Sequence, residues 1–185
     1  ENVRRQVCLT LEEMGIQPER SHHEQGPGQN EIDFQYAPAL VAADNLTTFK
    51  SVVKTVANLN GLFASFLPKP LAGQPGSGLH INISLFQGGR NIIETEKGVH
   101  SAISEQFIAG ILRRAPELTA FLNPLTNSYA RFGEFEAPCF VSWSHQNRSQ
   151  LVRIPAAHGD FRRMELRSPD PAASPYLAFT LLIHA

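Results

Sequence analysis

One short segment carries three polar side chains that could take part in chemistry. Residues 79–85 read LHINISL, so alternation along an extended chain places His80, Asn82 and Ser84 on one face and apolar residues on the other. A strand that merely faces water usually carries Lys, Thr, Glu or Gln there. An imidazole, an amide and a hydroxyl in a row instead suit the binding of a metal or an anion. The glycine-rich stretch 73–78 leads into this segment and could offer backbone N–H groups to an anion, although it lacks the Gly-x-x-x-x-Gly-Lys-Ser/Thr pattern.

Carboxylates and arginines are grouped in a similar way elsewhere. Arg163, Glu165 and Arg167 alternate with Met and Leu, so they share one strand face. Glu24 and Glu31 flank a tight polar turn that could bring two carboxylates together. Each group also has an ordinary interpretation, as solvated surface, as a hydrogen-bonded histidine or as a salt-bridged strand face. Three carboxylates and an imidazole on inward faces are nevertheless costly to gather without a cation, so the set predicts a metal site.

The types of the candidate ligands indicate which metal is expected. Oxygen-rich ligation with a single imidazole favours Mg²⁺ or Mn²⁺ over Zn²⁺, which usually recruits Cys or several His. Arginines in or beside loop-to-strand motifs supply the opposite charge: Arg131, Arg148, Arg153, Arg163 and Arg167. Guanidinium groups bind carboxylate and phosphate oxygens with two parallel hydrogen bonds, although each arginine alone could be an ordinary surface ion-pair residue. A divalent metal together with an arginine cluster predicts phosphoryl transfer from a nucleotide.

Composition narrows the class of protein. The chain has 185 residues, of which 42% are hydrophobic and 18% charged, and its net charge is −1. These values are typical of a globular domain, and they give no reason to expect a nucleic acid or membrane partner. Cys8 and Cys139 stand in unlike contexts, so a disulfide framework is not expected and a reducing cytoplasm fits. The chain begins without Met and ends in an unfinished apolar helical run, so we expect an excised portion of a longer protein.

The predicted elements indicate an α+β fold. Helices are expected at about 2–15, 43–60, 99–115 and 175–185, and strands at about 20–25, 31–37, 62–67, 79–86, 150–154 and 161–167. Asp44 is a plausible N-cap, Pro175 suits a first helical turn, and Gly88-Gly89 predicts a turn. Residues 123–149 predict a long ordered loop that carries function. Hairpin-like strand pairs between helices favour a largely antiparallel, curved sheet, with the helices packed on its apolar face.

Taken in order, the motifs resemble those of one known family. The matching stretches are 22–24, 28–31, 69–70, 76–80, 84–85, 127–129 with Arg131, 136–138, 147–149, 153–155, 163–167 and 169–173. This set, which covers nearly the whole chain, resembles the catalytic domain of glutamine synthetase. The resemblance implies a fold related to that of guanidino kinases, with residues 1–185 forming one catalytic domain truncated at both ends. It also implies a parent protein that forms large rings and joins ammonia to L-glutamate with ATP.

The resemblance also implies roles for particular residues. It makes Glu24 and Glu31 ligands of one catalytic Mg²⁺ or Mn²⁺, and His80 and Glu165 ligands of another. The residues that resemble ATP contacts are Glu19, Asn82, Ser84, Arg153 and Arg163. Those that resemble the groups holding glutamate and the transferring phosphoryl are Gly76, Arg131, Arg148 and Arg167. Glu136 resembles a carboxylate on a mobile flap that closes the site and helps to take a proton from ammonium.

Departures from the family pattern leave other functions open. Pro75 stands where the family usually has Asn, Asn82 where it often has His, and Ser168 where it has an apolar or aromatic residue; no Lys lies between Arg153 and Glu165. The alternatives are a γ-glutamyl-amine ligase, a non-catalytic paralogue and a guanidino-type phosphotransferase, the last disfavoured by the ligand set. Because the family completes its site with residues outside this span, the 185 residues alone are expected to be inactive.

Overall fold

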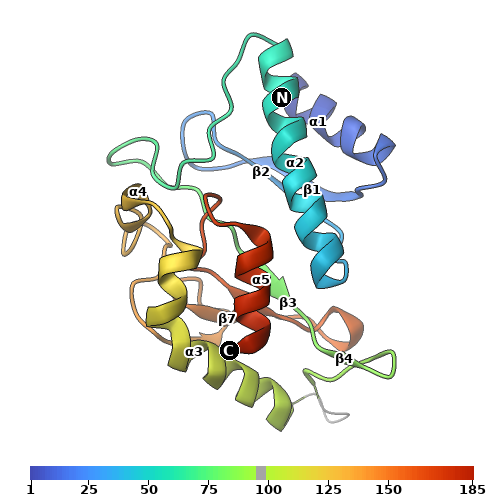
Figure 1. The fold of residues 1–185 in the computed structure, drawn as a ribbon, viewed down its shortest axis with the longest axis vertical. Helices are drawn as coiled ribbons and strands as arrows, with labels where there is room; N and C mark the ends of the chain where they lie inside the picture. Colours follow the sequence, from blue (N-terminus) through green and yellow to red (C-terminus); the bar gives the residue numbers. More distant parts are fainter. Residues whose placement is uncertain (95–98) are drawn as a thin grey trace. The chain divides into compact units, whose positions relative to one another are not determined.

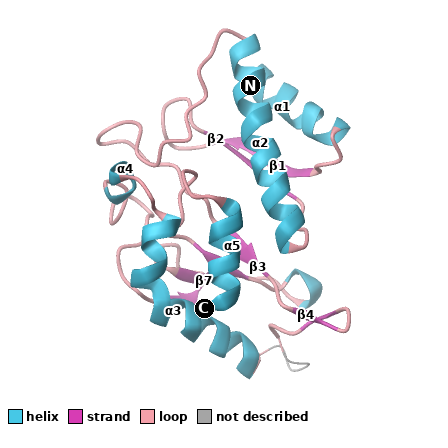
Figure 2. Cartoon of the chain, viewed as in Figure 1, coloured by secondary structure: helices cyan, strands magenta, loops and turns pink. Residues whose placement is uncertain are grey.

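The computed structural model of the chain describes residues 1–94 and 99–185. The described residues form two compact units, whose elements are labelled in Figure 1 and coloured by type in Figure 2. The first unit comprises residues 1–66 and 70–75, and the second comprises residues 67–69 and 76–185. None of the described helices is long and apolar enough to cross a membrane.

The first unit packs two helices against a β-hairpin. Its elements are α1 (Asn2–Glu13), β1 (Pro18–His23), β2 (Asn30–Phe34) and α2 (Ala39–Leu59). The two strands pair antiparallel, in a register that places His22 opposite Glu31. Apolar residues at helical spacing bury one stripe of each helix and close a small core with the hairpin. The buried members of this core are Val7, Leu11, Ile16, Val52 and Val56.

The second unit contains a four-stranded sheet. In spatial order its strands are β3 (Ile81–Ile83), β8 (Met164–Leu166), β7 (Val152–Ile154) and β6 (Trp143–His145). β8 pairs antiparallel with both neighbours, whereas β7 and β6 are parallel. Two helices, α3 (Ala102–Leu122) and α5 (Pro175–His184), lie side by side in this unit (Figure 1). The remaining elements are β4 (Phe86–Gln87), β5 (Arg90–Asn91), the helix α4 (Thr126–Tyr129) and the 3₁₀ turn η1 (Gly159–Phe161).

Alternation along β8 separates an apolar face from a polar one. Met164 and Leu166 are each 1% exposed and belong to the core that α3 and α5 complete. Glu165, between them, therefore points to the opposite face of the sheet. Because a slip of one residue would bury the carboxylate in this core, the apolar face fixes the register of a strand only three residues long.

The sheet differs from the single, largely antiparallel one that the sequence predicts. Among the described residues the strands form three small sheets, and the β1–β2 pair belongs to a different unit from β3. The parallel pairing of β6 with β7 makes the four-stranded sheet mixed. The mixed α and β class is confirmed, as is the turn at Gly88-Gly89, which joins β4 to β5. Alternation specifies which residues share a face but not which strands pair, so the strand pairing could not be predicted from it.

Two predicted features of the first unit are wrong. Asp44 is not an N-cap, because α2 begins five residues earlier, after Pro38. The alanines and leucine from Ala39 onward form helix readily and extend it toward the N-terminus. No strand is described at 62–67: the backbone there is irregular, and Phe63 is 93% exposed. A short apolar run becomes a strand only where another strand offers its edge.

Helix α3 begins and ends later than predicted. It begins after Ser101, whose hydroxyl caps it by accepting a hydrogen bond from the Ser104 N–H at 3.2 Å. It then continues through Pro116 instead of stopping before it. Proline inside a helix costs about 3 kcal/mol, and the buried Leu118 and Leu122 beyond it offset this cost by extending the apolar stripe. β8 is shorter than the predicted strand at 161–167: it covers Met164–Leu166, and η1 occupies Phe161.

Candidate active site

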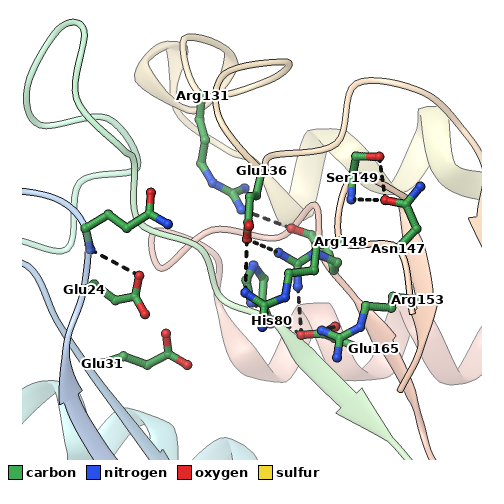
Figure 3. A network of polar contacts seen from close by, with 12 residues as sticks. Glu24, Glu31, His80, Arg131, Glu136, Asn147, Arg148, Ser149, Arg153 and Glu165 are labelled. Carbon is green, nitrogen blue, oxygen red and sulfur yellow. Dashed lines mark hydrogen bonds and ion pairs between the residues drawn. The ribbon is translucent and has the colours of Figure 1, made fainter. Parts of the chain in front are cut away.

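Glu165 is the centre of a charged cluster in the second unit (Figure 3). Its Oε2 accepts a hydrogen bond from Arg153 at 2.8 Å, and its Oε1 accepts one from Arg167 at 3.1 Å. The Nδ1 of His80 lies 3.6 Å from the same Oε1. Glu165 as a whole is 7% exposed, so the charge of its carboxylate is balanced by these neighbours rather than by water.

The strand register explains why these side chains meet. Asn82 on β3 lies opposite Glu165, which lies opposite Arg153 on β7, which in turn lies opposite Ser144 on β6. Paired residues present their side chains to the same face of a sheet, so these four form a row across all four strands. His80, two residues before Asn82, joins the same face, as predicted from alternation.

The charges around His80 determine its protonation. Burial, followed by the charges of Arg167 and Arg131, lowers the pKa of His80 to about 3. The imidazole is therefore neutral at physiological pH, and its ring nitrogens can offer a lone pair. A neutral imidazole beside a buried carboxylate is a donor set that fits a divalent cation.

Arg131 braces the backbone that follows β8. Its guanidinium donates to the carbonyl oxygens of Arg167, Ser168 and Pro169, at 3.1, 2.8 and 3.4 Å. Burial, with a smaller contribution from Arg167 and against the charge of Asp170, lowers the pKa of Arg131 to about 10, so it stays cationic. The structure thus places Arg131 where it fixes the position of Arg167, and a direct contact with substrate stays a prediction.

Two glycines make room for this guanidinium. A Cβ at Gly76 would overlap the carbonyl oxygen of Pro68 and lie 3.2 Å from the Cγ of Arg131. A Cβ at Gly78 would come within 2.7 Å of both Arg131 and the Nε2 of His80. Gly76 was expected as a substrate contact. Gly78 was given no role, although the pair of glycines just before His80 was the signal that could have found it.

The predicted flap carboxylate lies beside two arginines. Glu136 is exposed, and its Oε2 is 3.7 Å from a guanidinium nitrogen of Arg148 and 3.7 Å from one of Arg167 (Figure 3). The residue before it, Phe135, has a φ of 55°, which is uncommon outside glycine. Glu136 is therefore held near the arginine cluster by charge, from a loop that takes a sharp turn.

Lys69 contacts this loop; it belongs to one of the matching stretches but was given no role from the sequence. Its backbone N–H donates to the Oδ1 of Asn127 at 2.8 Å, and its carbonyl accepts from the Nδ2 at 2.9 Å. Its Nζ lies 3.6 Å from the Oε2 of Glu134 and 5.0 Å from the ring centroid of Phe135. These contacts join residues far apart in the sequence, so no local pattern indicates them.

The residues expected to contact the nucleotide are divided between the units. Arg163 donates to the Oδ1 of Asn82 at 3.0 Å, and the hydroxyl of Ser84 donates to the Arg162 carbonyl at 3.1 Å. The Nε of Arg153 is buried and has no hydrogen-bond partner among the described residues. Glu19 lies exposed on β1 in the first unit. Arg153, Asn82, Ser84 and Arg163 thus line one face of the second unit's sheet and its margin.

The first unit holds a compact group of metal-ligand types. One donor atom from each of His22, Glu24 and Glu31 lies within 4.8 Å of the other two. The carboxylates of Glu24 and Glu31 come from the two ends of the hairpin turn and are drawn in Figure 3. Burial, then the charge and hydrogen bond of Asp33 and the charge of Glu24, raise the pKa of Glu31 to about 7. Such crowding of negative charge is what a divalent cation relieves, so this donor set also fits a metal.

The pairing of the predicted ligands is therefore clear within each unit. Glu24 and Glu31 lie together in the first, and His80 and Glu165 lie together in the second. Convergence of all four on one site stays a prediction. His22 was given no role, although its position two residues before Glu24 in an extended segment was a signal that could have included it.

Comparisons with known proteins show which family the chain resembles. The family model described as the glutamine synthetase catalytic domain matches residues 1–185. The chain is 51% identical over 188 residues to a glutamine synthetase of Clostridium saccharobutylicum, covering 100% of this chain and 42% of that protein. It resembles a cryo-EM structure of Plasmodium falciparum glutamine synthetase with a TM-score of 0.95 and 35% identity, over 99% of this chain and 36% of that one. It resembles GmaS in complex with ADP with a TM-score of 0.88 and 37% identity, over 98% and 44%.

The fold and the charged face of the four-stranded sheet are those of a catalytic domain, in which carboxylate, imidazole and guanidinium groups lie together on one face. The chain belongs to the glutamine synthetase family, as its catalytic-domain match over all 185 residues shows. It spans 42% of the length of the relative from Clostridium saccharobutylicum.

Proposed function

We propose that this chain is the central part of the catalytic domain of an ATP-dependent ligase that joins ammonia to the γ-carboxylate of L-glutamate. The observation that carries the proposal is Glu165, held by Arg153 and Arg167 and facing His80 on one sheet face. The family and the ADP complex of GmaS support a nucleotide as cosubstrate. The products are then glutamine, ADP and phosphate, through a γ-glutamyl phosphate.

The arginines address the central difficulty of this reaction, which is that two anions must meet. The γ-phosphate of ATP and the substrate carboxylate repel each other unless fixed positive charges lie between them. Arg167 is oriented by Glu165 on one side and by the carbonyl contact from Arg131 on the other. Arg148, exposed beside Glu136, can turn toward an anion that enters. Because Arg167 is already held in place, it can stabilise the developing charge without rearranging during the reaction.

The metal ligands that we propose are Glu24 and Glu31 for one divalent cation, and His80 and Glu165 for another. Mg²⁺ or Mn²⁺ there would neutralise phosphate charge and polarise the phosphoryl oxygens. The chain's own contribution is to keep His80 neutral and to hold the carboxylate of Glu165 in place. We propose that Glu19, Asn82, Ser84, Arg153 and Arg163 contact ATP.

Glu136 is proposed to act after phosphoryl transfer. Its carboxylate lies beside Arg148 and Arg167, where it can attract ammonium and accept a proton from it. The same ion pairs hold the loop over the arginines, which excludes water from an acyl phosphate that water would hydrolyse. The Cα of Gly76 packs closely against the side chain of Arg131, and we propose that both residues help to hold glutamate.

The setting of the reaction is proposed from the same family membership. Residues 1–185 would form part of one catalytic domain in a ring-shaped homo-oligomer in the cytoplasm, without nucleic acid or membrane partners. Pro75 favours one alternative, a γ-glutamyl-amine ligase, because it stands where the family's Asn is expected to touch the substrate amino group. A non-catalytic paralogue is the other alternative, and the intact Glu165 cluster argues against it.

The test is an assay of the complete protein for phosphate release with ATP, L-glutamate and a series of amines that begins with ammonia. Arg167→Lys should lower the rate on the order of 100-fold, as expected for loss of a preorganised charge-stabilising group. Arg113→Lys, on the exposed side of α3, is the matched control and should leave the rate unchanged. Activity only with a larger amine would support the γ-glutamyl-amine alternative, and no activity with any amine would refute the ligase proposal.

A further inference from the structure

Two polar side chains that the proposed mechanism does not use are completely buried in the second unit. Asn123, which ends α3, and Asp170, in the segment after β8, are each 0% exposed. The Nδ2 of Asn123 donates to the Oδ2 of Asp170 at 2.9 Å, and the Oδ1 of Asp170 accepts from the Ala172 N–H at 2.9 Å. A carboxylate is costly to bury unless its oxygens are bonded, so these bonds fix one arrangement of the chain around it.

The pair anchors the segment after β8 to the end of α3. The Nδ2 of Asn123 also donates to the Ser168 carbonyl oxygen at 2.8 Å, and the Asp170 N–H donates to the Leu122 carbonyl oxygen at 3.2 Å. The guanidinium of Arg131 donates to the same Ser168 oxygen, at 2.8 Å. One backbone oxygen therefore joins Asn123 to Arg131.

The anchored segment connects two parts of the charged cluster. At its start, Arg131 donates to the carbonyl oxygen of Arg167 at 3.1 Å. Farther along, the Pro169 carbonyl oxygen accepts from the N–H of Leu79 at 2.9 Å, and Leu79 directly precedes His80. A shift of this segment would therefore move Arg167 and His80 together.

The charge of Asp170 also acts on Arg131, which is 3% exposed. Burial lowers the pKa of Arg131, the charge of Asp170 opposes this, and the like charge of Arg167 adds to it by a smaller amount. Two guanidinium groups that lie near each other in a buried place repel, and a carboxylate beside them reduces the cost. Asp170 thus stabilises the arrangement in which Arg131 holds the backbone of Arg167.

We propose that Asp170, together with Asn123, is a positioning residue that fixes Arg167 for phosphoryl transfer, an inference that rests on the role proposed above for Arg167. Because Asp170 is 0% exposed, it does not contact a substrate and acts through Arg131 and the backbone between them. A displacement of about 1 Å in a group that acts on the transition state can cost on the order of 100-fold in rate.

The experiment is a double-mutant cycle in the complete protein, with ATP-dependent phosphate release as the measured rate. Asp170→Asn keeps the shape of the side chain but removes its charge and one acceptor. It should lower kcat about tenfold or more and leave the KM for ATP nearly unchanged, because the transition state depends on the position of Arg167 more than substrate binding does. In an Arg167→Lys background, the same change should lower the rate less than about twofold, since the group through which Asp170 acts has already been replaced.

Two further variants separate positioning from a general loss of stability. Asn123→Ala removes the donor side of the pair and should show the same dependence on Arg167, so it provides a second test if Asp170→Asn folds poorly. Leu118→Ala removes a buried apolar side chain of the same helix, α3. It should lower the thermal stability without lowering kcat.

The possible outcomes distinguish the two proposals. Equal losses in the two backgrounds, or no loss from either variant of the pair, would overturn the role of Asp170 and leave the proposed function intact. Failure of both variants to fold would also overturn it, because the pair would then serve the fold alone. If Arg167→Lys itself left the rate unchanged, the proposed role of Arg167 would fail, and the role of Asp170 would fail with it.

Discussion

Replacing Glu165 by Gln tests whether one carboxylate holds the candidate site together. Gln has nearly the same shape but no charge, so Arg153 and Arg167 lose the carboxylate that each contacts, at 2.8 and 3.1 Å. The side chains of Arg167 and Glu165 are 4% and 9% exposed, so water cannot replace the lost partner. Removing one member of a buried ion pair costs roughly 3–5 kcal/mol. We expect a value near the lower end, because the Arg153 side chain is 20% exposed and can be partly hydrated.

Amide hydrogen exchange measures this loss locally, even in a large oligomer. The N–H of Arg167 donates to the carbonyl of Leu151 at 2.9 Å, so its exchange reports opening between β8 and the chain that leads into β7. A loss of about 3 kcal/mol should speed exchange by roughly two orders of magnitude. The measurement is made with a chelator present, so that loss of a bound metal does not contribute.

Glu136→Gln is the control for this prediction. Glu136 also contacts Arg167, at 3.7 Å, but its side chain is 51% exposed. An exposed ion pair contributes about 0–1 kcal/mol, so exchange at Arg167 should change little. If Glu165→Gln altered exchange no more than Glu136→Gln, the cluster would be held by its backbone alone, and the argument from buried charge would be wrong.

The remaining predictions concern pH, ammonia and the loop. Because the pKa of Glu31 is raised to about 7, the folded state binds the proton of this carboxyl more tightly than the unfolded state does. This proton binding stabilises the metal-free fold at acidic pH, and the stabilisation is lost as the pH rises toward 7. Mn²⁺ affinity should rise over the same interval, since the cation displaces a proton; titrations at several pH values measure this, and Asp33→Asn should move the transition to lower pH. Glu136→Ala should leave ATP binding intact and lower the rate of amide formation, and equal loss of both would contradict its proposed role. Lys69→Met should speed hydrogen exchange in residues 131–137, whereas Lys54→Met, which removes a similar contact with an aromatic ring in the other unit, should not.

Alternation was a reliable guide to which residues share a face. It placed Glu165 opposite Met164 and Leu166, and the structure buries those two residues while turning the carboxylate toward His80. This works because the side-chain period of a strand is two, and a slip would bury charge. β6 lies in the segment 123–149, which was predicted as a loop, so neither this strand nor its pairing with β7 was predicted.

Contacts between residues far apart in the sequence were also not predicted. The amide of Asn127 bonds both backbone groups of Lys69, 58 positions away, and Arg131 bonds carbonyls beyond β8. Such bonds satisfy backbone groups in loops, so they depend on where the loops run and not on any local period. His22 differs, because its relation to Glu24 is local and was visible in the sequence.

The two proposed ligand pairs lie in opposite electrostatic surroundings. Burial and then the neighbouring carboxylates raise the pKa of Glu31, whereas burial and then the neighbouring arginines lower the pKa of His80. A cation approaching Glu31 meets excess negative charge and needs no other partner. A cation approaching Glu165 meets a carboxylate already neutralised by two guanidinium groups, so its affinity there must be lower until an anion joins it. A phosphate bound by these arginines would neutralise their charge, so they would no longer repel the metal. Anion and cation would therefore bind there together.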